Sequence, residues 1–419
     1  MSFISLLLYI TAIYIRPQEW LPQVYGWPLI DILAIATAFF VILETMHTKK
    51  IIVNHPQNIL LLAFLGAVVF SHLSHTYMWG AYDSFIKFGK IVVMFFLFVT
   101  VLNSQKKLKI AIWLIVILTV ILALQGIYQY RHGFGWAGQP LVQQRGKHPI
   151  FRITWIGIFN DPNDLALAFV VAIGFLLSFI FSRVSFFTKI ISIPLVGVLI
   201  YSLYLTNSRG GYLALGATTM YYFLRKMKNK ILALIIGGVL AFSIFIFGPS
   251  RLSNISIRED SAYGRIEAWY EGFQMLKNAP LFGVGYRMFT DYYPLTAHNS
   301  YILVAAEEGL IGLFIWIALI YTCFKGLYIL TGRNNGLKPY VSGLEAGLVG
   351  FLSASFFLSR SYVTLLYILL ALASAFAYTF LRKDEYSFGV KDVKRAGMLT
   401  IGILFIIWIS MRVSLRILG

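Results

Sequence analysis

The chain has 419 residues, of which 59% are hydrophobic and only 12% are charged, and its mean hydropathy is +0.76. This composition excludes a soluble globular protein of the same length and indicates an integral membrane protein. The formal net charge of +18 could suggest nucleic-acid binding, but basic cytoplasmic loops that face anionic lipid explain it without a nucleic acid. We therefore expect membrane lipid, and no nucleic acid, as a partner.

Apolar segments of the chain predict transmembrane helices, because most of them are long enough to cross a hydrocarbon core of roughly 30 Å. We count 13 such segments, at residues 2–15, 30–46, 58–75, 84–102, 109–127, 165–182, 190–206, 210–224, 231–247, 300–324, 340–358, 363–381 and 397–414. The first is short and the last leaves two arginines outside, so the expected number of helices is 12 to 14. The sequence predicts an all-α polytopic membrane protein with a single transmembrane domain over residues 1–419.

Basic residues are concentrated in every second loop between these segments, for example at Lys49-Lys50, Lys106-Lys107 and Arg225-Lys226. By the positive-inside rule these loops are cytoplasmic, and the N-terminus is then cytoplasmic as well. Two long loops, at 128–164 and 248–299, lie on the extracytoplasmic side. The chain has one cysteine, which excludes an internal disulfide and a cysteine metal cage.

The first long outer loop carries positive charges that are disfavoured on that side, including Arg145 and Arg152. They could bind an anionic ligand, and ordinary solvated loop charge is the alternative. The loop ends in Asn160-Asp161-Pro162-Asn163-Asp164, which predicts a turn followed by a helix cap. We expect Asp161 and Asn163 to be structural and no metal to bind, although two aspartates could hold one.

An arginine lies between two apolar segments with almost no room for a loop, in Thr206-Asn207-Ser208-Arg209-Gly210-Gly211. An ionisable residue at the end of a membrane helix is costly, so it needs a partner or a water-filled cavity. The guanidinium fork suits each phosphate of a pyrophosphate better than the point charge of a lysine does. Arg209 is therefore a candidate for binding pyrophosphate.

The second long outer loop contains an amphipathic helix that we expect to lie on the membrane surface. Its apolar residues recur at three- and four-residue spacing, at Ile266, Trp269, Phe273 and Leu276. Arg265, at its start, could bind phosphate or could snorkel to lipid headgroups. Trp269 could stack on a sugar or belong to an aromatic belt at the interface. Arg287 adds a further positive charge to this loop.

His298 lies immediately before the apolar run that opens at Ile302. A helix N-terminus and nearby arginines both disfavour imidazolium, so we expect a neutral ring that can accept a proton from a hydroxyl. A histidine that caps the helix or anchors the interface is the alternative. Glu307 lies nine residues later, deep in the apolar run, which predicts a structural pair or a proton path.

From about residue 150 to the C-terminus the chain resembles the O-antigen ligase and O-antigen polymerase superfamily of bacterial membrane proteins. The resemblance rests on Asn160 to Ala166, on Ser208-Arg209-Gly210-Gly211, on Gly264-Arg265 with Trp269, on Pro280 with Gly283 and Gly285, and on His298-Asn299-Ser300-Tyr301 with Glu307, Gly309 and Gly312. Each motif is weak alone, but in this order around one long outer loop they are fairly specific.

The resemblance implies a helical fold of the GT-C type in the bacterial inner membrane, with the active site facing the periplasm. It also implies a glycan donor linked to undecaprenyl pyrophosphate, no metal or other cofactor, and inverting transfer. On matching positions, Arg209 and Arg265 would bind the pyrophosphate and His298 would assist the acceptor hydroxyl. We expect the other residues that contact substrate to be Asn299, Trp269, Arg145, Arg152, Arg287 and Arg360.

Three functions are compatible with these residues. A ligase would transfer the glycan to a lipid A core or a similar acceptor. A polymerase would use a second lipid-linked glycan as acceptor and would need further phosphate-binding arginines. A lipid-linked glycan transporter would instead place its site near the midplane and would show inverted repeats, which are absent from the sequence. We favour the ligase because the His298-Asn299 motif with Glu307, Gly309 and Gly312 is the best match.

Overall fold

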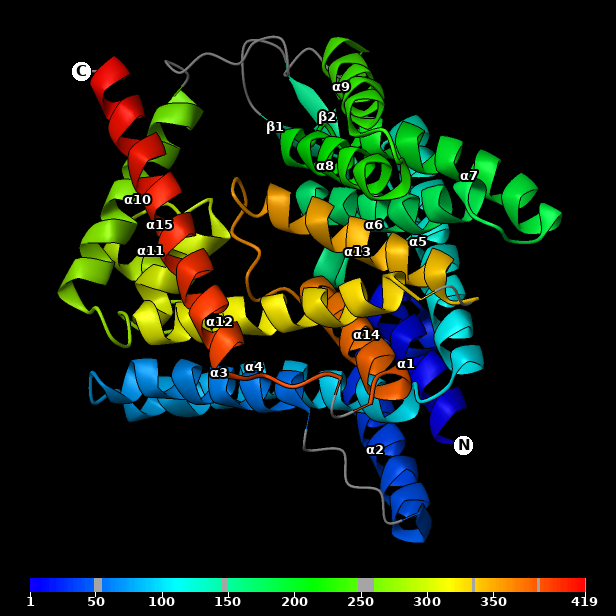
Figure 1. The fold of residues 1–419 in the computed structure, drawn as a ribbon, viewed down its shortest axis with the longest axis horizontal. Coiled ribbons are helices and arrows are strands. Elements are labelled where there is room, and N and C mark those ends of the chain that lie inside the picture. The colour runs from blue at the N-terminus through cyan, green and yellow to red at the C-terminus, as the bar shows by residue number, and fades with distance from the viewer. Residues whose placement is uncertain (49–54, 145–148, 248–259, 334–335, 383–384, 419) are drawn as a thin grey trace. The chain divides into compact units, whose positions relative to one another are not determined.

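The computed structural model describes residues 1–48, 55–144, 149–247, 260–333, 336–382 and 385–418. Over these residues the chain is mainly helical (Figure 1). The strands that the described residues contain form one antiparallel hairpin of β1 (Val142–Gln144) and β2 (Ile150–Arg152), in which Gln143 is opposite Phe151. The predicted all-α class is therefore confirmed.

Each of the 13 predicted apolar segments lies on a helix. These helices are α1 (Ser2–Ile15), α2 (Leu29–Thr48), α3 (Pro56–Leu73), α4 (Met78–Val101), α5 (Gln105–His132), α6 (Pro162–Phe181), α7 (Phe186–Leu205), α8 (Arg209–Lys226), α9 (Lys230–Phe247), α12 (Ser300–Thr331), α13 (Lys338–Ala354), α14 (Thr364–Phe380) and α15 (Val390–Leu418). The amphipathic segment of the second long loop is α10 (Asp260–Asn278), and α11 (Phe289–Tyr292) is a single turn.

Several helices are long and apolar enough to cross a membrane. Among the described residues there are eight of them: α2 to α7, α12 and α15. α1 and α14 are apolar but shorter. The protein is thus a polytopic membrane protein, while the expected 12 to 14 crossings and the side on which each loop lies stay predictions.

The chain divides into two compact units. Unit 1 comprises residues 1–50, 97–254 and 327–354, and unit 2 comprises residues 51–96, 255–326 and 355–419. In unit 1, α13 packs against α6 and α8. Glycines make this approach close, because a Cβ at Gly343 would lie 2.8 Å from the Cα of Phe175 and one at Gly174 would lie 3.2 Å from the carbonyl oxygen of Gly343.

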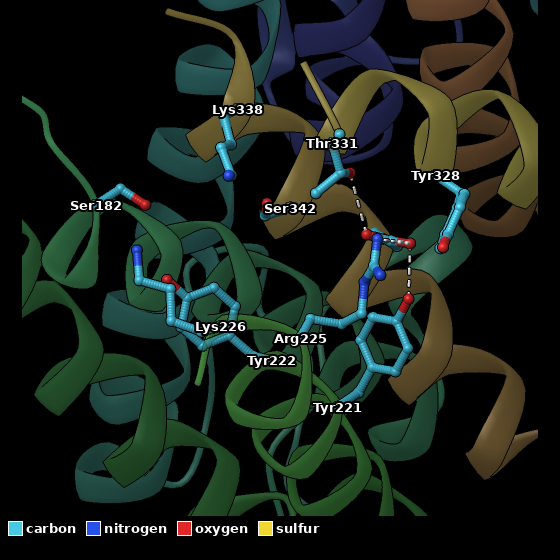
Figure 2. A pocket seen from close by; sticks show the side chains of 11 residues that line it. Ser182, Tyr221, Tyr222, Arg225, Lys226, Tyr328, Thr331, Lys338 and Ser342 are labelled. Atoms are coloured by element: carbon cyan, nitrogen blue, oxygen red, sulfur yellow. Dashed lines mark hydrogen bonds and ion pairs between the residues drawn. The ribbon is translucent and has the colours of Figure 1, made fainter. Parts of the chain in front are cut away.

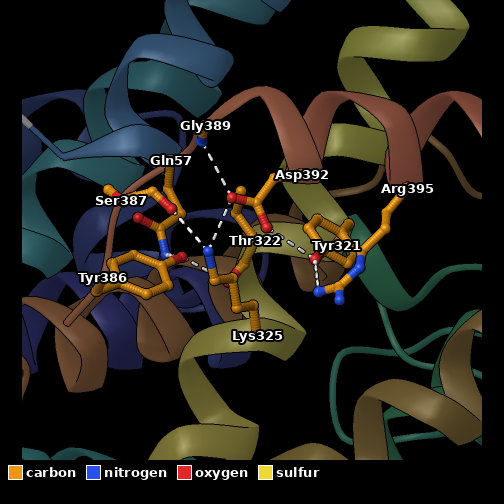
Figure 3. Close-up of polar contacts among 9 residues, drawn as sticks. All are labelled: Gln57, Tyr321, Thr322, Lys325, Tyr386, Ser387, Gly389, Asp392 and Arg395. Carbon is orange, nitrogen blue, oxygen red and sulfur yellow. Dashed lines mark hydrogen bonds and ion pairs between the residues drawn. The ribbon is translucent and has the colours of Figure 1, made fainter.

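In unit 2, a polar cluster joins α12 to the segment that leads into α15 (Figure 3). The Lys325 ammonium lies 2.9 Å from a carboxylate oxygen of Asp392 and donates to the carbonyl of Ser387 at 2.7 Å. The Tyr321 hydroxyl donates to the other Asp392 oxygen at 2.9 Å. In this cluster a positive and a negative charge neutralise each other, as expected for a structural ion pair.

Candidate active site

The structure describes every candidate residue except Arg145, which lies outside the described residues, and the candidates are divided between the two units. Unit 1 contains Arg152, Asp161, Asn163 and Arg209. Unit 2 contains Arg265, Trp269, Arg287, His298, Asn299, Glu307 and Arg360.

In unit 1, two motifs that are far apart in the chain meet through their helix caps. Asp161 caps α6, because its carboxylate accepts from the backbone N–H of Asn163 at 2.7 Å. Ser208 caps α8, because its hydroxyl oxygen accepts from the N–H of Gly211 at 3.0 Å. The same hydroxyl donates to the side-chain oxygen of Asn163 at 2.7 Å. The predicted turn and cap are confirmed, and they fix the start of α8 on the start of α6.

Arg152 connects β2 to both of these helix starts. Its Nε donates to the carbonyl of Thr206 at 2.8 Å, and its Nη2 donates to the Asn163 oxygen at 3.1 Å. The guanidinium therefore positions the turn between α7 and α8. Its predicted contact with substrate stays a prediction.

Arg209 is the first residue of α8 and is half-buried. Only three residues separate the end of α7 at Leu205 from it, as the sequence predicted. Gly211 lets α8 begin close to α6, because a Cβ there would lie 2.8 Å from the Cβ of Ala166. The position of Arg209 at a helix start is thus settled by packing, and its role in binding pyrophosphate stays a prediction.

In unit 2, α12 is interrupted at Gly309, which has φ 67° and ψ −168°. The loop at 280–285 replaces the missing helical hydrogen bonds. The N–H of Val284 donates to the carbonyl of Ala306 at 2.9 Å, and the N–H of Gly285 donates to the carbonyl of Glu307 at 3.0 Å. In the other direction, the N–H of Leu310 donates to the carbonyl of Pro280 at 2.9 Å. We call this element, residues 280–285 with 306–310, the glycine break.

Only glycine fits at the two closest points of the glycine break. A Cβ at Gly283 would lie 2.4 Å from the carbonyl oxygen of Glu307, and one at Gly309 would lie 2.3 Å from that of Leu281. Both glycines also have positive φ, which L side chains rarely adopt. Two of the motifs that carried the resemblance, Pro280 to Gly285 and Glu307 to Gly309, are therefore one structural element.

Glu307 is buried beside the glycine break, with 2% of its surface exposed. Its Oε1 accepts from the N–H of Phe289, the first residue of α11, at 3.1 Å. Its neighbour Glu308 is also buried, and the Tyr362 hydroxyl donates to it at 3.4 Å. These contacts support the structural role that was predicted for Glu307, and a proton path through it stays a prediction.

Sequence reasoning missed two histidines, His72 in the last turn of α3 and His75 just after it, that bond the glycine break and the residue that follows it. His75 Nε2 donates to the carbonyl of Gly283 at 2.8 Å, and His72 Nε2 donates to that of Tyr286 at 3.2 Å. Each bonded nitrogen carries the proton because a carbonyl only accepts. Burial raises the pKa of the Tyr286 phenol, which keeps it neutral. No local signal reveals these pairs, because more than 200 residues separate the partners.

His298 lies at the start of α12, as predicted, and is half-buried. The buried side chain of Asn299 caps the helix, because its Oδ1 accepts from the N–H groups of Tyr301 at 2.9 Å and Ile302 at 3.1 Å. His298 has a left-handed backbone with φ 49°. The neutral state that the sequence predicted for its ring stays a prediction.

The loop at 355–360 lies beside this helix start. The N–H of Ser300 donates to the carbonyl of Ser355 at 2.7 Å, and its hydroxyl donates to that of Leu358 at 2.7 Å. The N–H of Arg360 donates to the same hydroxyl at 2.7 Å. The backbone of Arg360 is therefore bonded to Ser300, which lies two residues after His298 in the sequence. The two candidate residues thus belong to neighbouring segments.

α10 has the amphipathic character that the sequence predicted. Ile266 is buried while Glu267 and Lys277 are exposed. Trp269 is half-buried, and its indole nitrogen is buried with no hydrogen-bond partner among the described residues. Arg265 is half-buried, whereas Arg287 is exposed. The guanidinium of Arg287 lies 5.3 Å from the ring centre of Tyr286.

Part of the chain that contains these residues matches a known protein family. Residues 194–317 match the family described as O-Antigen ligase. The Exopolysaccharide production protein ExoQ of Rhizobium meliloti (strain 1021) is 31% identical over 124 residues, which cover 25% of this chain and 28% of that relative. The family match includes the starts of both α8 and α12 and the glycine break. The two comparisons support the resemblance drawn from the motifs, over the part of the chain that they match.

Proposed function

We propose that the chain is a membrane glycosyltransferase of the O-antigen ligase type. It transfers a glycan from undecaprenyl pyrophosphate to an acceptor hydroxyl, on a lipid A core or a similar molecule, at the periplasmic face of the inner membrane. The observation that best supports this proposal is the position of His298, a half-buried imidazole beside the capped start of α12 within the matched family segment.

The reaction exchanges one bond at the anomeric carbon for another. The acceptor hydroxyl attacks that carbon while His298 takes its proton, and the bond to the pyrophosphate oxygen breaks on the opposite face, which inverts the configuration. A positioned base contributes about 10²–10⁴-fold to the rate. Arg209 and Arg265 stabilise the charge on the departing pyrophosphate, so the step needs no metal.

The remaining candidates would contact the glycan or its phosphates. Trp269 offers an aromatic face to a sugar, and its buried indole N–H could donate a hydrogen bond to a sugar hydroxyl. Arg287, Arg360, Arg152 and Arg145 would add positive charge. Asn299 contributes mainly by fixing the helix start, because its side-chain oxygen already accepts two backbone hydrogen bonds.

A second candidate function is a polymerase that uses a second lipid-linked glycan as acceptor. The name of the relative, an exopolysaccharide production protein, favours this candidate, because an exopolysaccharide is a polymer. The chemistry at His298 would be the same. The two candidates differ only in the molecule that carries the attacking hydroxyl.

Deletion of the gene distinguishes the two candidates. For a ligase, long glycan should accumulate on the polyprenyl carrier and none should reach the final acceptor. For a polymerase, single repeat units should still reach the acceptor while long chains disappear. If the deletion strain makes the same glycans as the parent strain in the same amounts, neither proposal holds.

A further inference from the structure

An open cavity of about 350 Å³ lies in unit 1 between the ends of α6 and α8, the last turn of α12 and the start of α13 (Figure 2). Three basic residues among the described ones line it: Arg225, Lys226 and Lys338. The loop charges predict that these helix ends are cytoplasmic. The cavity therefore belongs to the opposite membrane face from the proposed transfer reaction, and nothing in that reaction uses it.

One wall of the cavity is a closed network around Glu345, whose side chain is only 2% exposed. The Tyr221 hydroxyl donates to one carboxylate oxygen at 2.7 Å, and the Thr331 hydroxyl donates to the other at 3.3 Å. An Arg225 nitrogen lies 3.6 Å from the carboxylate, and its guanidinium lies 4.6 Å from the ring centre of Tyr328. The charges of Arg225 and Glu345 therefore balance each other.

The other wall carries positive charge without a carboxylate to balance it. Glu345 is the single acidic residue among the described residues that line the cavity. Figure 2 shows the ends of Lys226 and Lys338 on the side of the cavity that carries Ser182, away from Tyr221 and Tyr328. Both lysines are exposed, and partial desolvation of Lys226, followed by the positive charges of Lys338, Lys189 and Arg183, lowers its pKa. Gathering like charges beside a cavity costs free energy that a bound anion would offset.

We propose that Lys226 and Lys338 bind a phosphate group in this cavity, with the hydroxyls of Ser182 and Ser342 as further donors. Two ammonium groups and two hydroxyls suit the compact charge and several acceptor oxygens of a phosphate ester. The general attraction of basic loops to anionic lipid explains positive charge at this face. It does not explain a cavity with one wall neutralised and the other left basic. The phosphate can come from a lipid headgroup of the inner leaflet or from a soluble phosphate ester.

The test uses the full-length protein in nanodiscs of phosphatidylcholine with two probes, spin-labelled phosphatidylglycerol and soluble glycerol phosphate. The variant Lys226→Gln/Lys338→Gln removes the basic wall. The matched control Lys106→Gln/Lys228→Gln removes the same charge from two lysines that are exposed like Lys226 and Lys338 but do not line the cavity. We expect the first variant to bind at least one probe about tenfold or more weakly, since each charge-assisted hydrogen bond is worth roughly that factor. The control should change binding less than about twofold, the small effect of an exposed charge.

The probe that is affected identifies the source of the phosphate. Loss confined to the spin-labelled lipid, or greater for it, assigns the cavity to a headgroup, whereas loss confined to glycerol phosphate assigns it to a soluble ester. Equal weakening by both double variants would mean that only surface charge attracts the anion, and it would overturn the proposal. So would failure of the wild-type protein to bind either probe.

Discussion

The two helix starts that carry candidate residues, α8 in unit 1 and α12 in unit 2, share one local design. Each begins with a side-chain cap, Ser208 in α8 and Asn299 in α12. Each cap follows a residue with a left-handed backbone, Asn207 with φ 48° and His298 with φ 49°. The same turn thus appears twice, once in each unit.

The residue in the left-handed position is what differs. Asparagine suits this conformation, and the Asn207 amide also donates to the carbonyl of Phe151 at 3.2 Å. Local turn chemistry therefore explains Asn207. In α12 the position holds a histidine, which is also enriched in this conformation, so the backbone does not distinguish the two residues. The comparison therefore shows one turn with two residues that tolerate it, and a role of the His298 imidazole in chemistry stays a prediction.

The two helices also differ beyond their first turn. α8 continues without interruption, whereas α12 is broken at Gly309 and held there by the loop at 280–285. The start of α8 therefore depends on its caps. The start of α12 depends on its cap and on the glycine break, and the variants below separate these contributions.

Gly309→Ala should have the largest effect, because it removes the feature that α8 lacks. The new Cβ would lie 2.3 Å from a backbone oxygen, and the backbone conformation is one that alanine rarely adopts. We expect a loss of about 3 kcal/mol or more in the free energy of unfolding. Thermal unfolding of the purified protein in detergent measures it, with Gly197→Ala as control, since a Cβ at Gly197 meets nothing within 4 Å. A melting temperature equal to that of the control would mean that the break is not a constraint.

His298→Asn should have the next largest effect, and it should fall on activity alone. Asparagine tolerates the left-handed backbone but cannot accept a proton at neutral pH, so glycan transfer in a deletion strain should fall about 10²–10⁴-fold. Asn207→Gly is the matched change in α8 and should leave transfer near the wild-type level. If both variants lose transfer equally, the turn matters and the imidazole does not.

Arg209→Lys should reduce transfer by a smaller factor. Lysine keeps the charge but loses the fork that binds two phosphate oxygens at once, a loss of about 10- to 100-fold. The initial rate at varied donor concentration is the measurement, and the melting temperature should not change. Unchanged kinetics for the lysine variant would remove Arg209 from the pyrophosphate site.

Removing the caps should have the smallest effect. Ser208→Ala and Asn299→Ala should each lower the free energy of unfolding by about 0.5–2 kcal/mol. Ser208→Ala also removes the hydrogen bond to Asn163, so it should lie toward the upper end of that range. Thermal unfolding of both variants and of the wild type provides the comparison. A stabilised variant would contradict the assignment of that residue as a cap.

Local patterns were sufficient to predict the helices and the cap of α6, whereas the caps at Ser208 and Asn299 were not predicted. The apolar segments, the turn at Asn160 to Asp164 and the helix start after His298 all rest on neighbouring residues, and each was confirmed. The glycines of the motif are visible in the sequence, but the need for glycine at 283 comes from its close contact with Glu307. No local pattern reveals that contact. His72 and His75, at the end of α3 and just after it, were missed for the same reason.

The catalytic and binding roles of the candidate residues could not be predicted from local patterns in the same way. A motif gives a residue type at a position, and the structure then shows its backbone partners, as it does for Arg152 and Asn299. Binding and proton transfer depend on a substrate that neither the sequence nor the fold contains. The roles of Arg209, Arg265 and His298 therefore remain predictions that kinetics must test.

Transfer by purified protein tests the central claim most directly. The wild-type protein and His298→Asn would be reconstituted in liposomes with an undecaprenyl-pyrophosphate-linked glycan and an acceptor, in the presence of EDTA, and free undecaprenyl pyrophosphate would be measured over time. We expect release by the wild type with glycan on the acceptor, and release slower by about 10²–10⁴-fold for the variant. Equal release by the two proteins, or release that requires added divalent metal, would contradict a metal-independent transfer in which His298 is the base.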